Sequence, residues 1–297
     1  MRILVSGGTG LVASALIPAL ERSGNAVTRL VRTPSPDSRD SVLWDPLRGI
    51  VDRRALEGVD AVVHLAGEPL LGRWTAAKKR RIAESRVGST RFLGASLAAL
   101  ERRPAVLVCA SASGYYGDRG DAMLTEDSPR GHGYLADLCG EWEAAAEPAR
   151  AAGIRVVHVR TGLALARNGG LLRTMVLPFR LGLGGPIGRG RAYWSWIALD
   201  DLVAVYRFAI ARADLSGAVN AASPNPVTNA DFTRTLGAVL RRPTVLPVPP
   251  MALRLAFGGE AAGEMLAGTR LAPARLLGAG FRFQYPELKP ALEHVLG

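Results

Sequence analysis

The chain has 297 residues, of which 48% are hydrophobic and 21% are charged. This length and composition exclude a small disulfide-stapled scaffold and a disordered tail, and they suit a large α/β domain with room for a smaller lobe. The formal net charge of +11 would suit a polyanionic partner, but 34 of the 37 basic residues are arginines, as in proteins from GC-rich coding sequences, so we predict no nucleic-acid partner.

Strands and helices alternate through the first half of the chain. Residues 2–6 form a β-branched run that ends at glycines, and residues 11–23 carry apolar side chains at helical spacing up to Gly24. The same patterns predict strands at 27–31, 42–44, 60–66, 105–110 and 154–159, and helices at 76–100 and 135–151. This alternation predicts an α/β fold with a Rossmann-type doubly wound parallel sheet.

Beyond residue 165 the pattern loosens. Glycines from 169 to 190 and prolines from 224 to 250 predict loops, with short helices at 200–212, 229–240 and 251–257. We therefore predict a nucleotide-binding domain over 1–165, completed by segments around 191–222, and a substrate lobe mainly over 166–297. The glycine-rich 182–190 segment is a candidate loop to close over substrate.

A glycine turn lies between the first strand and the first helix. Gly7 would permit the tight turn, Gly10 the close approach of a phosphate, and Ala13 the packing of helix on strand. Backbone N–H groups at a helix N-terminus attract a pyrophosphate, whereas the alternative is an ordinary strand-to-helix turn. The terminal strand and immediate helix favour a dinucleotide site made by Gly7, Thr9, Gly10, Leu11 and Val12.

Arg32 stands just after the second strand, 22 positions beyond Gly10. An NAD enzyme has an acidic residue near this point to hold the ribose diol, whereas a guanidinium binds a 2′-phosphate. The alternative is a surface arginine, of which this chain has many. The position favours NADP(H) as the cofactor.

Several motifs together resemble an extended short-chain dehydrogenase/reductase. More narrowly, the chain is similar to an atypical epimerase-like subgroup whose members often carry the label NAD-dependent epimerase or cell-division inhibitor. The matching segments are HLAGEPL (64–70), RWTAAKKRRIAESRVGST (73–90), SASGYYGDRGD (111–121), WEAAA (142–146), RTGLAL (160–165), LPFRLGLGGPIGRG (177–190) and WSWIALDDL (194–202). The segment 249–296 resembles the small C-terminal domain of this subgroup.

This resemblance implies roles for residues outside the glycine turn. His64, Leu65, Ala66 and Gly67 would run beneath the adenine and ribose side of the cofactor. Ser85 and Arg160 would approach the nicotinamide half or its phosphates. The alternative for His64 is a core histidine with satisfied hydrogen bonds, and a metal role lacks partner ligands.

Reductases of this superfamily normally use a Ser or Thr, a Tyr and a Lys four residues later, because the lysine cation helps a tyrosine of pKa ≈ 10 to exchange a proton. Ser111 or Ser113 could supply the hydroxyl, but Leu138 follows Tyr134 by four residues. Alignment on Trp142 and Glu143 instead puts Leu135 and Cys139 in the two roles. No lysine is close in sequence, so the remaining candidates are Ser111, Tyr134 and Tyr116, with Tyr115 less favoured; a packing role is the alternative for each tyrosine.

The sequence therefore predicts an NADP(H)-binding oxidoreductase or epimerase-like enzyme acting on a small polar substrate. The missing Tyr-Lys pair keeps open a non-catalytic NADP(H)-binding sensor or regulatory protein. The two cysteines favour free thiols, and no stretch reaches the ~18 apolar residues of a membrane span. We expect a cytoplasmic monomer or homodimer with no metal site.

Overall fold

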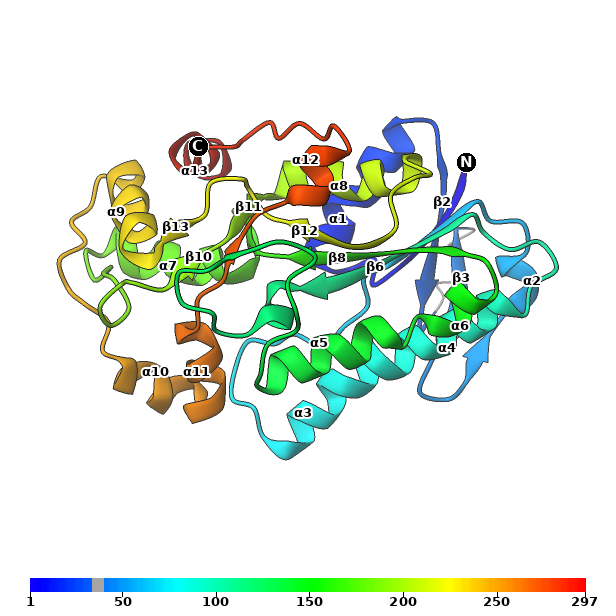
Figure 1. Cartoon of the computed structure of the whole chain (residues 1–297), viewed down its shortest axis with the longest axis horizontal. Helices are drawn as coiled ribbons and strands as arrows, with labels where there is room; N and C mark the ends of the chain where they lie inside the picture. Colours follow the sequence, from blue (N-terminus) through cyan, green and yellow to red (C-terminus); the bar gives the residue numbers. More distant parts are fainter. Residues whose placement is uncertain (34–39) are drawn as a thin grey trace.

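The computed structural model describes residues 1–33 and 40–297, and within these residues eight strands form the central sheet in the order β12-β8-β6-β5-β1-β2-β3-β4 (Figure 1). The pairings are parallel except for the antiparallel pair of β3 and β4. The strands are β1 (Arg2–Ser6), β2 (Ala26–Val31), β3 (Ser41–Asp45), β4 (Ile50–Val51), β5 (Ala61–His64), β6 (Val106–Ala112), β8 (Arg155–Thr161) and β12 (Gly217–Ala221). The predicted doubly wound parallel sheet is confirmed.

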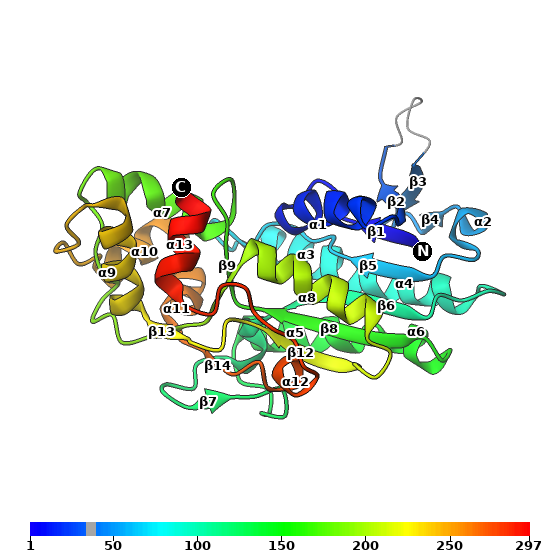
Figure 2. The same cartoon turned by 90° about the horizontal axis from the view of Figure 1, so that it is seen from above.

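Helices cover both faces of this sheet (Figures 1 and 2). Alternate residues of β1 point to opposite sides, so that Ile3 and Val5 join one apolar core and Leu4 joins the other. The first core is covered by α1 (Leu11–Arg22) and α8 (Leu199–Ala211), and the second lies under α4 (Ser89–Ala98) and α6 (Glu147–Ala151). Burial on both faces explains why the strands read as continuous hydrophobic runs.

Both of the long helices predicted in the first half are interrupted. The helix expected over 76–100 consists of α3 (Ala76–Ala83), a π-helical turn η1 (Glu84–Gly88) and α4. The one expected over 135–151 divides into α5 (Tyr134–Ala144) and α6, with Pro148 in the first turn of α6, where it needs no N–H donor. A short helix α2 (Arg53–Leu56) precedes β5.

The second half builds a lobe with its own core, seen at the left of Figures 1 and 2. Trp196, Phe232 and Leu292 are buried together there. The expectation of loops after Gly169 was wrong at α7 (Gly170–Arg180), which has an apolar stripe despite the flanking glycines and Pro178. The remaining lobe helices are α9 (Asn229–Leu240), α10 (Pro250–Phe257), α11 (Gly259–Leu266) and α13 (Leu288–Leu296). Helix α12 (Ala274–Gly278) packs on the central sheet instead, where Leu276 joins the first core. Helices α11, α12 and α13 were not predicted.

Short strand pairs join the lobe to the sheet. They are β9 (Leu163–Leu165) with β11 (Trp196–Ala198), β10 (Tyr193–Trp194) with β13 (Val227–Thr228), and β7 (Met123–Leu124) with β14 (Arg270–Leu271). Of the later strands, β12 joins the main sheet, whereas β10 and β11 stay outside it. A 3₁₀ turn η2 (Ser113–Tyr116) follows β6.

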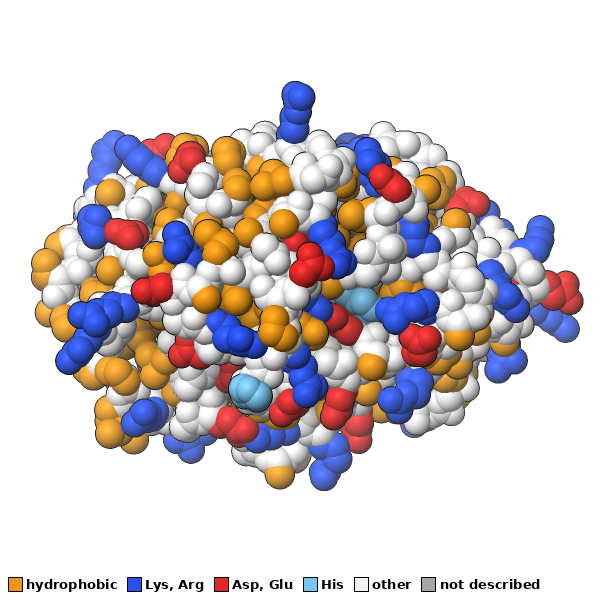
Figure 3. All heavy atoms as spheres, viewed as in Figure 1, with side chains coloured by type: hydrophobic (Ala, Val, Ile, Leu, Met, Phe, Trp, Pro, Cys, Tyr) orange, Lys and Arg blue, Asp and Glu red, His pale blue; other side chains and the backbone are white. Residues whose placement is uncertain are grey.

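The excess positive charge is dispersed on the face shown in Figure 3, where Lys and Arg side chains alternate with acidic and apolar ones. This face has no continuous basic stripe of the kind that follows a phosphate backbone. Among the described residues, no helix is long and apolar enough to cross a membrane, and no group of three metal-ligating side chains is assembled.

Candidate functional site

The glycine turn after β1 is pressed against the segment that follows β5. Gly7 has φ +71°, and a Cβ atom on it would lie 2.7 Å from the backbone of Leu65 and Ala66. A Cβ on Gly10 would lie 3.2 Å from the Gly7 carbonyl oxygen, which accepts a hydrogen bond from the Gly10 N–H at 2.9 Å. Both glycines are therefore required by close backbone approach, the second less strictly.

Helix α1 presents an open N-terminus at this turn. Its N-cap is Gly10, which offers no side chain to the first N–H groups, and no acidic residue stands in its first turn. Those N–H groups have no partner within the helix. Thr9 and Gly10 are exposed, and Leu11 and Val12 are half-buried. This arrangement provides donors for an anion such as a pyrophosphate.

Arg32 directly follows the last residue of β2, and β2 is the neighbour of β1 in the sheet. Its side chain is exposed, and within residues 1–33 and 40–297 it has no hydrogen-bond or ion-pair partner. Another arginine, Arg29 of β2, passes its side-chain methylenes beside Gly8 and pairs with Glu21 at 3.3 Å. Arg29 is therefore engaged, whereas the Arg32 guanidinium has no partner among the described residues.

His64 is a core histidine whose two ring nitrogens both have partners. Nδ1 lies 2.6 Å from the Ser6 hydroxyl, and Nε2 lies 3.1 Å from the Ser89 hydroxyl. Because Ser89 donates to the Ser85 carbonyl at 2.6 Å, the network assigns the ring proton to Nε2 and makes Ser6 the donor to Nδ1. Ser6 in turn accepts from the N–H groups of Leu65 and Ala66.

This network fixes the shape of the segment after β5 instead of supplying a reactive group. Burial lowers the pKa of His64 to about 4, so the ring is neutral at pH 7. The hydrogen bonds hold Leu65 and Ala66 against Gly7. The predicted contact of His64, Leu65, Ala66 and Gly67 with a cofactor stays a prediction, and the satisfied-core alternative for the His64 side chain is the one observed.

The π-helical turn η1 places two polar side chains against the segment that follows β5. The Ser85 hydroxyl accepts from the Glu68 N–H at 2.8 Å and donates to the Ile82 carbonyl at 3.0 Å. Arg86 is buried beside Gly67 and donates to the Glu68 carbonyl at 2.8 Å. Burial lowers the pKa of Arg86, and none of the described carboxylates forms an ion pair with it.

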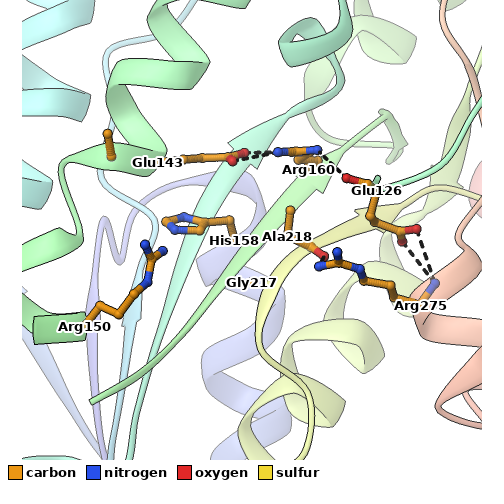
Figure 4. A pocket seen from close by; sticks show the side chains of 9 residues that line it. Glu126, Glu143, Arg150, His158, Arg160, Gly217, Ala218 and Arg275 are labelled. Carbon is orange, nitrogen blue, oxygen red and sulfur yellow. Dashed lines mark hydrogen bonds and ion pairs between the residues drawn. The ribbon is translucent and has the colours of Figure 1, made fainter. Parts of the chain in front are cut away.

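Arg160 is held in a different environment, which we call the Arg160 cluster (Ser111, Tyr116, Glu143, Arg160 and Asn220). Its guanidinium binds both oxygens of Glu143 at 2.8 Å, and Ser111 donates to the same carboxylate at 2.7 Å (Figure 4 shows the ion pair). The Tyr116 hydroxyl accepts from Arg160 at 2.9 Å and donates to Asn220 at 2.7 Å.

The cluster is shielded from solvent, with Ser111 and Arg160 each 4% exposed and Tyr116 fully buried. Burial favours a raised pKa for Glu143, but the Arg160 hydrogen bonds outweigh it and the pKa is lowered. Burial raises the pKa of Tyr116 to about 12. The predicted catalytic roles of Ser111 and Tyr116, and the predicted approach of Arg160 to the nicotinamide half of the cofactor or its phosphates, stay predictions. All three side chains already have partners within the protein.

Tyr134 lies at the start of α5, at the junction between the sheet domain and helices α10 and α11. Its hydroxyl donates to the Lys79 carbonyl at 3.2 Å, and its ring packs on Trp74 with centroids 5.2 Å apart. Lys79 Nζ lies 4.7 Å from the centre of the Tyr134 ring and forms an ion pair with Glu260 of α11. Lys79 is far from Tyr134 in sequence, but folding brings it against the Tyr134 ring.

This lysine does not restore the missing pair. Lys79 approaches the face of the Tyr134 ring and is neutralised by Glu260. Burial raises the pKa of Tyr134, although the charge of Arg86 acts in the opposite direction. Tyr134 is thus a neutral phenol at pH 7, suited to donate a proton and unsuited to act as a base.

The residues aligned with the Tyr and Lys roles are an apolar pair. Leu135 packs against Gly114 of η2, where an added Cβ would lie 2.9 Å from Leu135 Cβ. Cys139 is 2% exposed, and burial raises its pKa to about 12. Neither side chain can exchange a proton at pH 7.

Three features of this region were not found from the sequence. Arg86 was inside a matched motif, but only folding shows that it is buried without a carboxylate partner. Glu143 and Asn220 complete the Arg160 cluster from positions 17 and 60 residues away in sequence. Glu143 lies in the matched WEAAA segment, but neither residue is marked in the sequence as a partner of this cluster. The 182–190 loop is also held in place by two backbone hydrogen bonds. The Gly188 N–H donates to the Val248 carbonyl at 3.0 Å, and the Val248 N–H donates to the Pro186 carbonyl at 2.9 Å.

Comparisons with known proteins match the whole chain. The model of the NAD dependent epimerase/dehydratase family matches residues 3–222, and that of a domain of unknown function, DUF1731, matches residues 248–295. The Mycobacterium bovis epimerase family protein Mb2239 is 43% identical over 294 residues, which cover 99% of this chain and 97% of that protein. Human epimerase family protein SDR39U1 is 36% identical over 301 residues, with full coverage of both chains.

Two solved structures are similar to the whole chain. The crystal structure of human SDR39U1 (isoform 2) with NADPH has a TM-score of 0.89 and 34% identity, and covers 99% of each chain. The nucleoside-diphosphate sugar epimerase from Corynebacterium glutamicum has a TM-score of 0.83 and 39% identity, and covers 100% of this chain and 58% of that one.

Proposed function

The chain belongs to the NAD dependent epimerase/dehydratase family, and from this premise we propose that it binds NADP(H) at the glycine turn and reduces a small polar carbonyl substrate. The observation that carries the proposal is an exposed Arg32 without a partner in residues 1–33 and 40–297, at the end of the strand that pairs with β1, together with an open N-terminus of α1. The similar crystal structure of human SDR39U1 with NADPH supports the choice of dinucleotide.

The residues present fit this cofactor. The first N–H groups of α1 would take the pyrophosphate, since Gly10 leaves them uncapped and the first turn carries no competing acid. Arg32 would bind the 2′-phosphate as a bidentate donor. When bound, NADPH supplies the hydride for the reaction.

The protein's own part in the reaction is proton delivery and orientation. Tyr134, a neutral phenol, would donate a proton to the substrate oxygen as negative charge develops on it. Arg86, which has no carboxylate partner among the described residues, would stabilise that charge from the side of Gly67. The reverse reaction needs a base, and burial keeps Tyr134 from that role, so we propose that the protein works in the direction of reduction.

The cofactor assignment is tested by binding measurements on Arg32→Ala. We expect NADPH affinity to fall by about 10- to 100-fold, because a charge-assisted bidentate contact is lost, and NADH affinity to change little. The control is Arg22→Ala, an exposed arginine at the far end of α1. Equal losses for NADPH and NADH would remove Arg32 from this role.

The reaction is tested by NADPH consumption in the presence of a panel of aldehydes, ketones and sugar nucleotides. We expect turnover that falls by about 100-fold in Tyr134→Phe, the lower end of the range for general acid catalysis. NADPH binding should be unchanged in this variant. Unchanged turnover in Tyr134→Phe would exclude Tyr134 as the proton donor.

One observation favours a second candidate function, a non-catalytic NADP(H)-binding sensor. Leu135 and the buried Cys139 occupy the positions aligned with the Tyr-Lys pair, and the Ser111 hydroxyl already donates a hydrogen bond to Glu143. A sensor would bind NADPH tightly and turn over none of the panel. Substrate-dependent oxidation of NADPH at any steady rate would reject it.

A further inference from the structure

A polar pocket of about 320 Å³ lies between β8, β12 and the helices α5 and α6. It is on the opposite side of β6, β5 and β1 from β2, the strand that Arg32 follows, and is therefore separate from the proposed cofactor site. Ala144, Gly217 and Ala218 contribute little side-chain volume to its wall, which leaves the space open. Its volume is at the lower end of the range for ligand sites in proteins.

His158 is the unusual residue of this pocket. It is 3% exposed, yet neither Nδ1 nor Nε2 has a hydrogen-bond partner among the described residues, whereas both nitrogens of His64 are satisfied. Figure 4 shows the ring turned toward the Arg150 guanidinium. Buried polar atoms are almost always paired, so two open nitrogens facing a cavity indicate that something outside the protein chain binds there.

The other charged groups of the wall are already engaged. Glu143 and Arg160 neutralise each other at 2.8 Å. Glu126 accepts from the Asn220 N–H at 2.9 Å and from the Arg275 N–H at 3.3 Å.

The two outer arginines differ in how firmly they are held. Arg275 donates to the Ala218 carbonyl at 3.1 Å as well as to Asp127 at 2.7 Å. Arg150 pairs only with Glu147, one turn away on its own exposed helix surface, and such exposed pairs are weak. Arg150 and His158 are thus the two groups free to bind a ligand.

We propose that this pocket binds the oxyanion group of a small metabolite, a carboxylate or a phosphate, between Arg150 and His158. A neutral imidazole offers one N–H donor, and a guanidinium offers a planar pair of donors that matches either oxyanion. Burial lowers the pKa of His158 to about 4, so the charge that attracts the anion comes from Arg150. The remaining volume accommodates a few more atoms of the ligand.

The proposal is tested by NMR of the imidazole groups of the intact protein, which has four histidines. Inorganic phosphate and acetate are titrated separately, and His158→Phe identifies the His158 signals. We expect one of the two anions to shift the His158 signals saturably, and the stronger one identifies the group recognised. His64, which is buried with both nitrogens paired, should not respond.

Arg150→Ala should weaken this binding by about tenfold or more, since it removes the charged contact. Arg91→Ala, an exposed arginine on α4, is the matched control and should leave it unchanged. No saturable shift with either anion, equal shifts at the exposed His132 and His294, or binding that survives Arg150→Ala would each overturn the proposal.

Discussion

Two polar regions lie at the carboxyl ends of strands of the same sheet, and their arginines differ in burial and in hydrogen bonding. In the Arg160 cluster the guanidinium is 4% exposed and bound to Glu143 and Tyr116. At the glycine turn Arg32 is exposed and has no described partner, and the N-terminus of α1 is uncapped. One region satisfies its donors within the protein, and in the other the donors have no partner among the described residues.

The difference shows that two arginines of one sheet can differ fully in whether their hydrogen bonds are satisfied within the protein, which neither residue type nor motif indicates. Both arginines have predicted roles near the cofactor, Arg32 from its position after the second strand and Arg160 from the family resemblance. The structure commits Arg160 to a buried ion pair, where an unpaired charge would be costly. Arg32 is exposed and forms no ion pair with any of the described residues, so its removal should affect stability far less than removal of Arg160.

The largest effect is expected for Arg160→Met, which leaves the carboxylate of Glu143 buried without its partner. Removing one member of a buried ion pair costs about 3–5 kcal/mol of unfolding free energy. The measurement is urea denaturation at pH 7. Arg212→Met is the matched control, since Arg212 binds Asp214 through two hydrogen bonds of 2.7–2.8 Å in an exposed pair, and we expect little change.

The double variant Glu143→Leu/Arg160→Met sharpens the same test. Replacing both charges by apolar side chains removes the unpaired carboxylate, so most of the lost stability should return. A loss as large in the double variant as in Arg160→Met would show that packing around Arg160, and not the ion pair, is what stabilises this region.

The next effect concerns the other region and compares two glycines with positive φ. Gly7 has φ +71° and no space for a Cβ, whereas Gly24 has φ +79° and nothing within 4 Å. We expect Gly24→Ala to cost about 1 kcal/mol for backbone strain alone and Gly7→Ala about 3 kcal/mol, because the Leu65–Ala66 backbone must also move. Urea denaturation of the two variants measures the difference, and equal losses would contradict the close approach of the turn.

A third effect depends on pH and compares the two buried histidines. Burial lowers the pKa of His64 and of His158 to about 4, so between pH 6.5 and 4 the unfolded chain takes up protons that the folded chain does not. The stability is full above pH 6.5 and should fall with decreasing pH by up to about 1.4 kcal/mol per pH unit for each histidine. His158→Gln should halve the slope between pH 6.5 and 5, and an unchanged slope would show that His158 is not kept neutral by the fold.

The sequence predicted the parts of the molecule that local patterns determine. Hydrophobic runs and glycine positions placed β1, α1, β2 and the turn at Gly7, because strand and helix periods are local properties. The contact of Lys79 with Tyr134 and the pairing of Arg160 with Glu143 depend on how distant segments pack, which one sequence does not encode in spacing. Helix α7 was missed because its flanking glycines and Pro178 are typical of loops, whereas packing in the lobe core stabilises it.

The smallest effect on stability is expected for Arg32→Ala, which removes an exposed arginine where Arg160→Met removes a buried one. An exposed side chain without partners contributes within about 0.5 kcal/mol, so the unfolding free energy without ligand should match that of the unmodified protein. Under the proposed function, added NADPH should raise the melting temperature of the unmodified protein more than that of Arg32→Ala, because tighter binding to the folded state stabilises it more. A loss of several kcal/mol without ligand would place Arg32 in a structural role like that of Arg160, and the contrast between the two regions would fail.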